Sequence, residues 1–75
     1  MAIKAMTRLE YIYLLKEAND EGRVVRALNG AIESREQWSA TNYWETYPKD
    51  MQDEFYRAYR AGYLSEHERL TKLGK

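Results

Sequence analysis

Hydrophobic residues recur at helical spacing near the start of the chain and cover most of the circumference of a helix over residues 8–18. A capping box, Thr7-Arg-Leu-Glu10, precedes this stretch: the Thr7 side chain can accept from the amide of Glu10, and the Glu10 side chain can reach back to the Thr7 amide. A helix that is apolar nearly all round is expected to be buried and central. The polar run from Asn19 to Gly22 interrupts the pattern and predicts the end of this helix, because Asn and Gly close helices and Asp can cap the next one.

The next segment carries two conflicting signals. Its apolar residues return at helical spacing, with Trp38 on the same stripe, and they are Val24, Val25, Leu28, Ala31 and Ile32. This spacing predicts a helix over residues 23–37. The pair Asn29-Gly30 between apolar residues is instead typical of a hairpin turn, which would place a hairpin over residues 24–34. The flanks of a hairpin alternate between apolar and polar positions and these do not, so the helix is favoured and the hairpin is kept as the alternative.

The last part of the chain predicts two further helices. Pro48 suits the first position of a helix over residues 48–61, because a missing N–H costs nothing there. The inward stripe of this helix consists of Met51, Phe55, Ala58, Tyr59 and Gly62. Gly62 is expected to end the helix. A second capping box, which begins at Ser65, then predicts a short helix over residues 66–73.

These segments together predict an all-α fold. We expect a small bundle of three main helices and one short C-terminal helix, forming a single helical domain over residues 1–75. A chain of 75 residues buries only about 60% of the surface that its unfolded form exposes, so the core must be small. The absence of cysteine excludes disulfides, thiol catalysis and Cys-ligated metals.

The charge balance argues against two classes of function. Twelve basic residues balance twelve acidic residues, and each half of the chain is neutral as well. Nucleic-acid binding usually needs a basic excess, and acidic DNA mimicry needs the reverse. The N-terminus has no apolar run long enough for a signal peptide, and the longest apolar run, residues 11–15, is far too short to cross a membrane. We therefore expect a cytoplasmic protein that does not bind membranes.

No residue pattern indicates catalysis, a cofactor or a metal. His67 is the single histidine, and its neighbours Glu66 and Glu68 point in other directions on a helix. The carboxylates of Asp50, Asp53 and Glu54 are explained by their place at a helix start, where the helix dipole favours acids. The glycines are too dispersed for a phosphate-binding loop. We expect no enzyme activity, no cofactor and no metal site.

Large aromatic residues gather in a connection between helices, from Trp38 to Tyr47. Trp38 extends a helical stripe, so we expect it to be buried. Trp44 follows a polar stretch that favours a turn, so we expect it to be partly exposed and its replacement by alanine to cost less than about 1 kcal/mol. On the third helix, Tyr56, Arg60 and Tyr63 form a ridge at helical spacing.

Tyrosine, tryptophan and arginine are typical of the centres of protein interfaces. The candidate partner-binding residues are therefore Tyr43, Trp44, Tyr47, Tyr56, Arg60 and Tyr63. The favoured function is a small non-catalytic interaction module of inhibitor or adaptor type, for example a phage-type inhibitor of a host enzyme or defence complex. One alternative is a small nucleic-acid-binding protein that stacks bases on the tyrosines. The other is a self-assembling homodimer, because oligomerisation stabilises chains with a small core.

Overall fold

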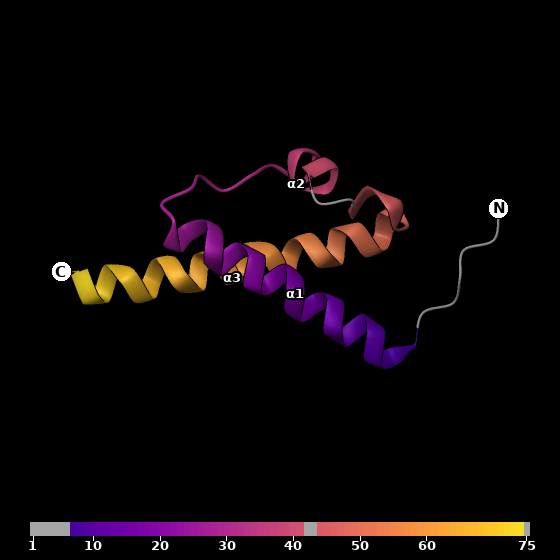
Figure 1. Ribbon diagram of the computed structural model, residues 1–75, viewed down its shortest axis with the longest axis horizontal. Coiled ribbons are helices and arrows are strands. Elements are labelled where there is room, and N and C mark those ends of the chain that lie inside the picture. Colours follow the sequence, from indigo (N-terminus) through magenta and orange to yellow (C-terminus); the bar gives the residue numbers. More distant parts are fainter. Residues whose placement is uncertain (1–6, 42–43, 75) are drawn as a thin grey trace.

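The computed structural model describes residues 7–41 and 44–74 and confirms the all-α fold. Its elements are α1 (Arg8–Ala27), α2 (Arg35–Thr41), the short 3-10 helix η1 (Trp44–Thr46) and α3 (Lys49–Gly74) (Figure 1). The described residues contain no strand, so the alternative hairpin over residues 24–34 is wrong.

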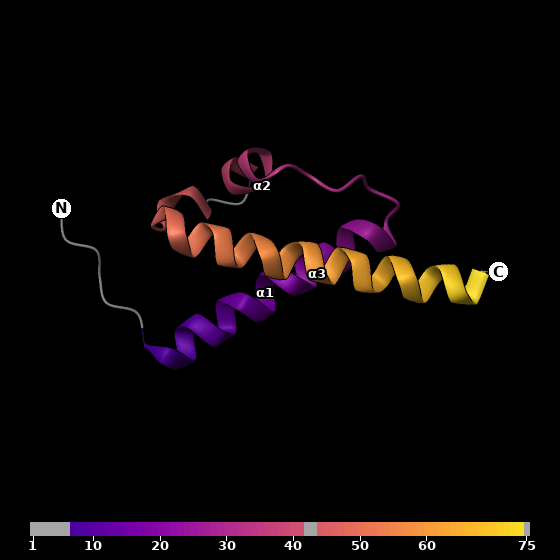
Figure 2. The same cartoon turned by 180° about the vertical axis from the view of Figure 1, so that it is seen from behind.

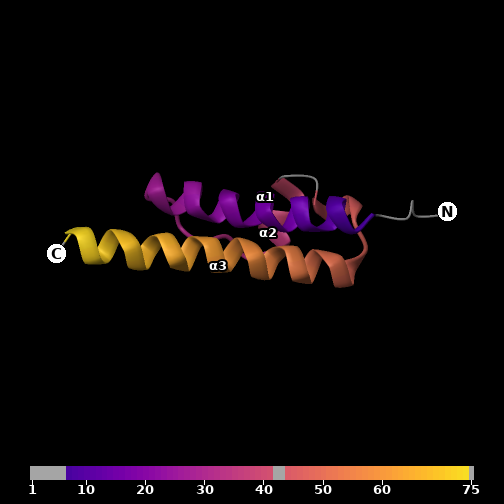
Figure 3. The ribbon, with the colours of Figure 1, turned by 90° about the horizontal axis from the view of Figure 1, so that it is seen from below.

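The two long helices, α1 and α3, run in the same direction and cross near their middles (Figures 1 and 3). Two contacts show that the helices are parallel. The rings of Tyr11 and Phe55 pack together near one end of the pair, and Arg26 donates a hydrogen bond to His67 near the other. The connection therefore has to return along the pair before α3 begins, and it carries α2 and η1. The view from behind shows α2 and the connection on one side of the crossing (Figure 2). The molecule is flat, with extents of 51 × 24 × 15 Å.

Glycine allows α1 and α3 to touch backbone to backbone at the crossing. A Cβ placed on Gly22 would lie 2.0 Å from the carbonyl oxygen of Tyr59, and one placed on Gly62 would lie 2.0 Å from the carbonyl oxygen of Asn19. The Asn19 side chain also donates to the carbonyl of Ala58 at 3.0 Å. The predicted helix end at residues 19–22 and the predicted stop at Gly62 are therefore wrong. Both glycines lie inside helices, where close packing requires them.

The pair Asn29-Gly30 terminates the first helix, whose last residue is Ala27. Asn29 has a φ of 64°, in the left-handed region that Asn tolerates better than most residues. The amide of Asn29 donates to the carbonyl of Arg26 at 2.9 Å, and the amide of Gly30 donates to the carbonyl of Val25 at 2.7 Å. This is a Schellman motif. The predicted helix over residues 23–37 is therefore wrong in its middle, because residues 28–34 leave the helix and cross to α2.

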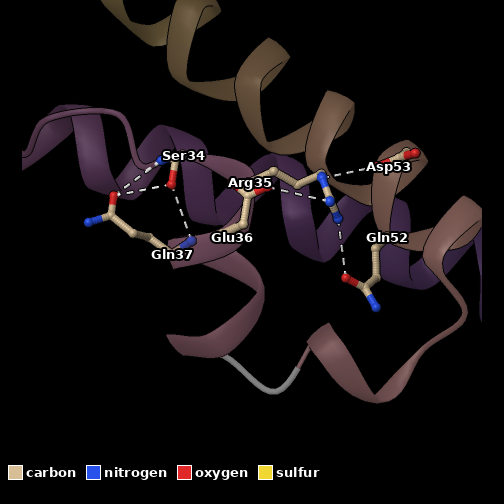
Figure 4. A network of polar contacts seen from close by, with 6 residues as sticks. All are labelled: Ser34, Arg35, Glu36, Gln37, Gln52 and Asp53. Carbon is tan, nitrogen blue, oxygen red and sulfur yellow. Dashed lines mark hydrogen bonds and ion pairs between the residues drawn. The ribbon is translucent and has the colours of Figure 1, made fainter.

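The short helix α2 begins at its own capping box and is tied to α3 by an arginine (Figure 4). The side chains of Ser34 and Gln37 exchange hydrogen bonds with each other's backbone amides, both at 3.3 Å. The Arg35 guanidinium reaches across to α3, where it lies 3.2 Å from the Asp53 carboxylate and 3.5 Å from the Gln52 side-chain oxygen. These contacts hold α2 against the first turns of α3.

The third helix continues through the predicted second capping box. Pro48 directly precedes the helix instead of being its first residue. Because Gly62 does not end the helix, no new helix begins at residue 66. Glu66 faces inward and is buried, and its carboxylate pairs with Arg69 at 2.6 Å. The hydrogen bonds that Arg69 donates to this carboxylate, together with the positive charge of Arg69, lower the pKa of Glu66 below its ordinary value.

The core is small and mostly aromatic. Its buried hydrophobic residues are Ala18, Trp38, Trp44, Phe55 and Tyr59. The predicted burial of Trp38 is confirmed, with none of its surface exposed. The stripe on which it was placed is nevertheless wrong, because Val24 and Leu28 are 55% and 77% exposed. Trp38 packs instead on the aromatic residues of η1 and α3.

Candidate interaction surface

An aromatic cluster fills the space between the two long helices and the connection. Trp38 stacks on Trp44 with 4.8 Å between ring centroids, and Trp44 packs on Phe55 at 5.0 Å. Tyr47 is half-buried and meets Phe55 edge-on at 5.5 Å. Trp44 is only 4% exposed, so its predicted exposure is wrong. The 3-10 helix η1 directs the Trp44 ring onto Trp38 instead of into solvent.

Both indole N–H groups of this cluster donate to one carboxylate oxygen. The Oε1 atom of Glu21 lies 2.8 Å from Nε1 of Trp38 and 3.1 Å from Nε1 of Trp44. Burial raises the pKa of Glu21, and the negative charges of Glu17 and Glu33 raise it further, while the two indole hydrogen bonds act in the opposite direction. No local pattern links position 21 to positions 38 and 44, so the sequence gives no sign of this bridge.

We expect Glu21→Gln to make the protein more stable than wild type at neutral pH. The folded state raises the pKa of Glu21, so it binds the proton more tightly than the unfolded state does. Stability is therefore lost as the pH rises from the ordinary value of 4.5 through the raised pKa. The glutamine oxygen can still accept from both indoles and does not titrate. The stability difference should grow from pH 4.5 towards neutral pH, as measured by urea unfolding.

The control for this experiment is Glu45→Gln, which removes one charge from an exposed position of η1. Its stability should follow that of wild type over the same pH range. Glu66 does not interfere, because its lowered pKa causes a loss of stability only as the pH falls below 4.5. A Glu21→Gln variant that is less stable than wild type at pH 7 would show that the negative charge itself holds the two indoles.

Three tyrosines of α3 attach the segment between α1 and α2. The hydroxyl of Tyr56 donates to the carbonyl of Glu33, and that of Tyr63 donates to the carbonyl of Gly30 at 2.9 Å. The amide of Glu33 in turn donates to the Tyr59 oxygen at 3.1 Å. Each of these hydrogen bonds stabilises by roughly 1 kcal/mol and leaves fewer backbone groups of the segment unpaired. Tyr56 and Tyr63, which were predicted to form an outward ridge with Arg60, therefore contact this segment through their hydroxyls.

The predicted partner-binding residues are therefore not one open surface. Trp44 is buried, and Tyr47, Tyr56 and Tyr63 are half-buried. Arg60 is exposed, and Tyr43 lies outside the described residues. A role of these residues in binding a partner remains a prediction.

A groove lies between α1, the connecting segment and α3. Its volume is about 480 Å³, and Val24, Val25 and Tyr59 form its apolar part. The remaining lining residues are all acidic, and they are Glu17, Asp20, Glu21 and Glu33. The sequence shows the acids of α1 but not Glu33 beside them, because its position depends on the Schellman motif and the tyrosine hydrogen bonds.

Large hydrophobic residues also line the side of α1 that faces away from α3. We call this surface the outer α1 face: it consists of Leu9, Ile12, Tyr13, Val24 and Leu28, which are between 51% and 79% exposed. The first three lie at positions i, i+3 and i+4, and the last two at i and i+4, so each group forms one patch on the helix. The apolar pattern over residues 8–18 predicts that Leu9, Ile12 and Tyr13 are buried, and this prediction is wrong.

The polar candidates have structural partners. His67 accepts from Arg26 through Nδ1 at 2.9 Å, and Asp53 pairs with Arg35. Within residues 7–41 and 44–74, no group of three or more acidic, histidine or cysteine side chains is placed to hold a metal ion. No helix in this part of the chain is long and apolar enough to cross a membrane.

Comparisons with protein-family models, with curated proteins and with solved structures find no significant match to this chain.

Proposed function

We propose that this protein is a small non-catalytic interaction module that docks onto a larger protein through the outer α1 face. The observation that supports the proposal is the distribution of hydrophobic side chains. Among the described residues, eight large hydrophobic side chains are exposed and only five hydrophobic residues are buried. Five of the eight belong to the outer α1 face. Exposed apolar surface of this kind is typical of interaction sites.

The arrangement on α1 fits a known mode of recognition. A helix that binds in a groove of its partner presents anchors at i, i+3, i+4 and i+7 spacing. Leu9, Ile12 and Tyr13 occupy the first three of these positions, and the fourth is Lys16. Val24 and Leu28 form a second patch about 20 Å further along the helix. Because α3 and the aromatic core support the opposite side of α1, the helix is already formed before binding. Such preorganisation lowers the entropic cost of association.

We expect Leu9→Gln/Ile12→Gln/Tyr13→Gln to lose partner binding while keeping the fold. The three side chains are 79%, 51% and 60% exposed, so each substitution should change stability by only about 0.5 kcal/mol. Tagged wild-type and variant proteins are used to capture proteins from a lysate of the native cells. Quantitative mass spectrometry then compares what each retains, and circular dichroism checks that the helical content is equal.

The matched control is Leu64→Gln/Leu73→Gln, which removes two exposed leucines from α3. It should retain the same proteins as wild type. If the α1 variant and wild type retain the same proteins, the outer α1 face is not the binding surface. If wild type retains no specific protein, the proposed function is wrong.

A homodimer is the second candidate, and the small core favours it. The inward stripe of α3 continues to Leu73, which is 71% exposed. Leu73 belongs to the last turn of α3, and the C-terminal end of this helix extends beyond the end of α1 (Figure 1). A second copy would cover such a residue. Light scattering over a concentration series separates the two functions, since a homodimer shows a mass that rises with concentration and a melting temperature that rises with it.

A further inference from the structure

The groove between α1 and the connecting segment combines an apolar part with an uncompensated negative charge. Val24 and Val25 line it from α1, and Tyr59 lines it from α3. Its four acidic residues come from two walls: Glu17, Asp20 and Glu21 from α1, and Glu33 from the segment opposite. None of the four forms an ion pair with another described residue. The volume of about 480 Å³ is in the range of sites that bind small ligands or single side chains.

The basic residues of α1 cannot neutralise this charge. At 100° per residue, all four lie on the half of the helix that faces away from the groove, and they are Arg8, Lys16, Arg23 and Arg26. Contacts confirm the direction of two of them: Arg23 donates to Asn19, and Arg26 donates to His67. The zero net charge of the chain therefore hides a strong separation of charge across α1.

We propose that this groove receives a long basic side chain, best an arginine, of the partner protein that docks on the outer α1 face. Arginine matches both parts of the groove. Its aliphatic stem can lie on Val24 and Val25, and its guanidinium offers five donors to carboxylates on two walls. Burial is the main cause of the raised pKa of Glu21, and binding would relieve the smaller contribution from the negative charges of Glu17 and Glu33.

A protein side chain fits better than a free cation because the groove is continuous with the outer α1 face. Val24 belongs to both, and Tyr13 donates to the groove residue Glu17 at 3.1 Å. A small amine or a metal ion would use the carboxylates but not the apolar residues on either side. The proposal rests on the proposed function, and it specifies the charge of the partner at this position.

The test uses two blocked tripeptides, Leu-Arg-Leu and the same peptide with neutral citrulline in place of arginine. Each is titrated into the full-length ¹⁵N-labelled protein at low ionic strength, about 20 mM, where screening is weak. We expect the arginine peptide to shift the amide signals of Val24, Val25 and Glu33 in a saturable manner. The citrulline peptide should bind at least about tenfold more weakly, a difference of about 1.4 kcal/mol.

The groove variant is Asp20→Asn/Glu33→Gln, because neither side chain makes a described hydrogen bond or ion pair on which the fold depends. This variant should bind the arginine peptide at least about tenfold more weakly than wild type does. The control, Asp50→Asn/Glu54→Gln, removes the same charge from α3 outside the groove and should bind the peptide as wild type does.

Three NMR results would overturn the groove proposal. The first is equal binding of the two peptides, and the second is equally strong shifts of the same amides with spermidine or Mg²⁺. The third is shifts of these amides on dilution of the protein alone, which would assign the groove to a second copy. A fourth result comes from the capture experiment. If the outer α1 face variant no longer captures partner proteins but Asp20→Asn/Glu33→Gln still does, the groove proposal is wrong and the proposed function is retained. If wild-type protein captures no specific protein, the proposed function is wrong. The peptide titration would still show whether the groove prefers arginine.

Discussion

Replacing Gly62 with alanine is expected to unfold much of the protein, although alanine favours a helix over glycine by about 1 kcal/mol. The added Cβ would lie 2.0 Å from the carbonyl oxygen of Asn19, a distance at which the two helices must separate. Backbone atoms cannot rotate away as a side chain could. Separation would weaken the packing along the whole crossing, including the contact of Asn19 with Ala58. We expect a loss of roughly 3 kcal/mol or more, comparable to the whole stability of a domain this small.

Gly22→Ala should behave in the same way, because its Cβ would lie 2.0 Å from the carbonyl oxygen of Tyr59. Urea unfolding followed by circular dichroism measures both variants. The control is Ala61→Gly, at an exposed position of α3 next to Gly62, where the loss should be only the helix-propensity difference of about 1 kcal/mol. A Gly62→Ala variant more stable than wild type would mean that α1 and α3 do not cross at this point.

The glycines also show where prediction from sequence succeeds and where it fails. The helical spacing and the Thr7–Glu10 capping box correctly predict that α1 exists and where it begins. The end of α1 and the continuity of α3 were predicted from local preferences, which treat glycine as a helix breaker. The close approaches of Gly22 to Tyr59 and of Gly62 to Asn19 join positions 37 and 43 residues apart. A rule based on neighbouring residues cannot detect such long-range packing. At these glycines the packing of α1 on α3 outweighs the low helix propensity of glycine.

The same limit applies to the candidate surface. The polar stretch before Trp44 favours a turn and so predicts an exposed ring. The structure buries Trp44 instead, because Glu21 satisfies the N–H groups of both indoles inside the core. The groove likewise combines residues of α1 with Glu33 from the connecting segment, so its charge is visible only after the segment is placed.

Trp44→Ala is expected to destabilise the protein by roughly 3–5 kcal/mol, as for other large aromatic truncations in a core. The ring is 4% exposed and packs between Trp38 and Phe55, so its removal leaves a cavity that these neighbours cannot fill. The loss should be close to that for Trp38→Ala, which is equally buried. Urea unfolding measures both, and a domain this small should be largely unfolded by either change.

The phenylalanine variants keep the test informative when the alanine variants do not fold. Trp38→Phe and Trp44→Phe each retain an aromatic ring but remove one indole donor to Glu21, so each should cost less than the alanine change, roughly 1–3 kcal/mol. Each also leaves a single tryptophan as a fluorescent reporter. Because both indoles lie in the same aromatic cluster, both variants should show blue-shifted emission that a soluble quencher reaches poorly. A solvent-like Trp44 in the Trp38→Phe variant would place that ring back on the surface, where it would be available to a partner.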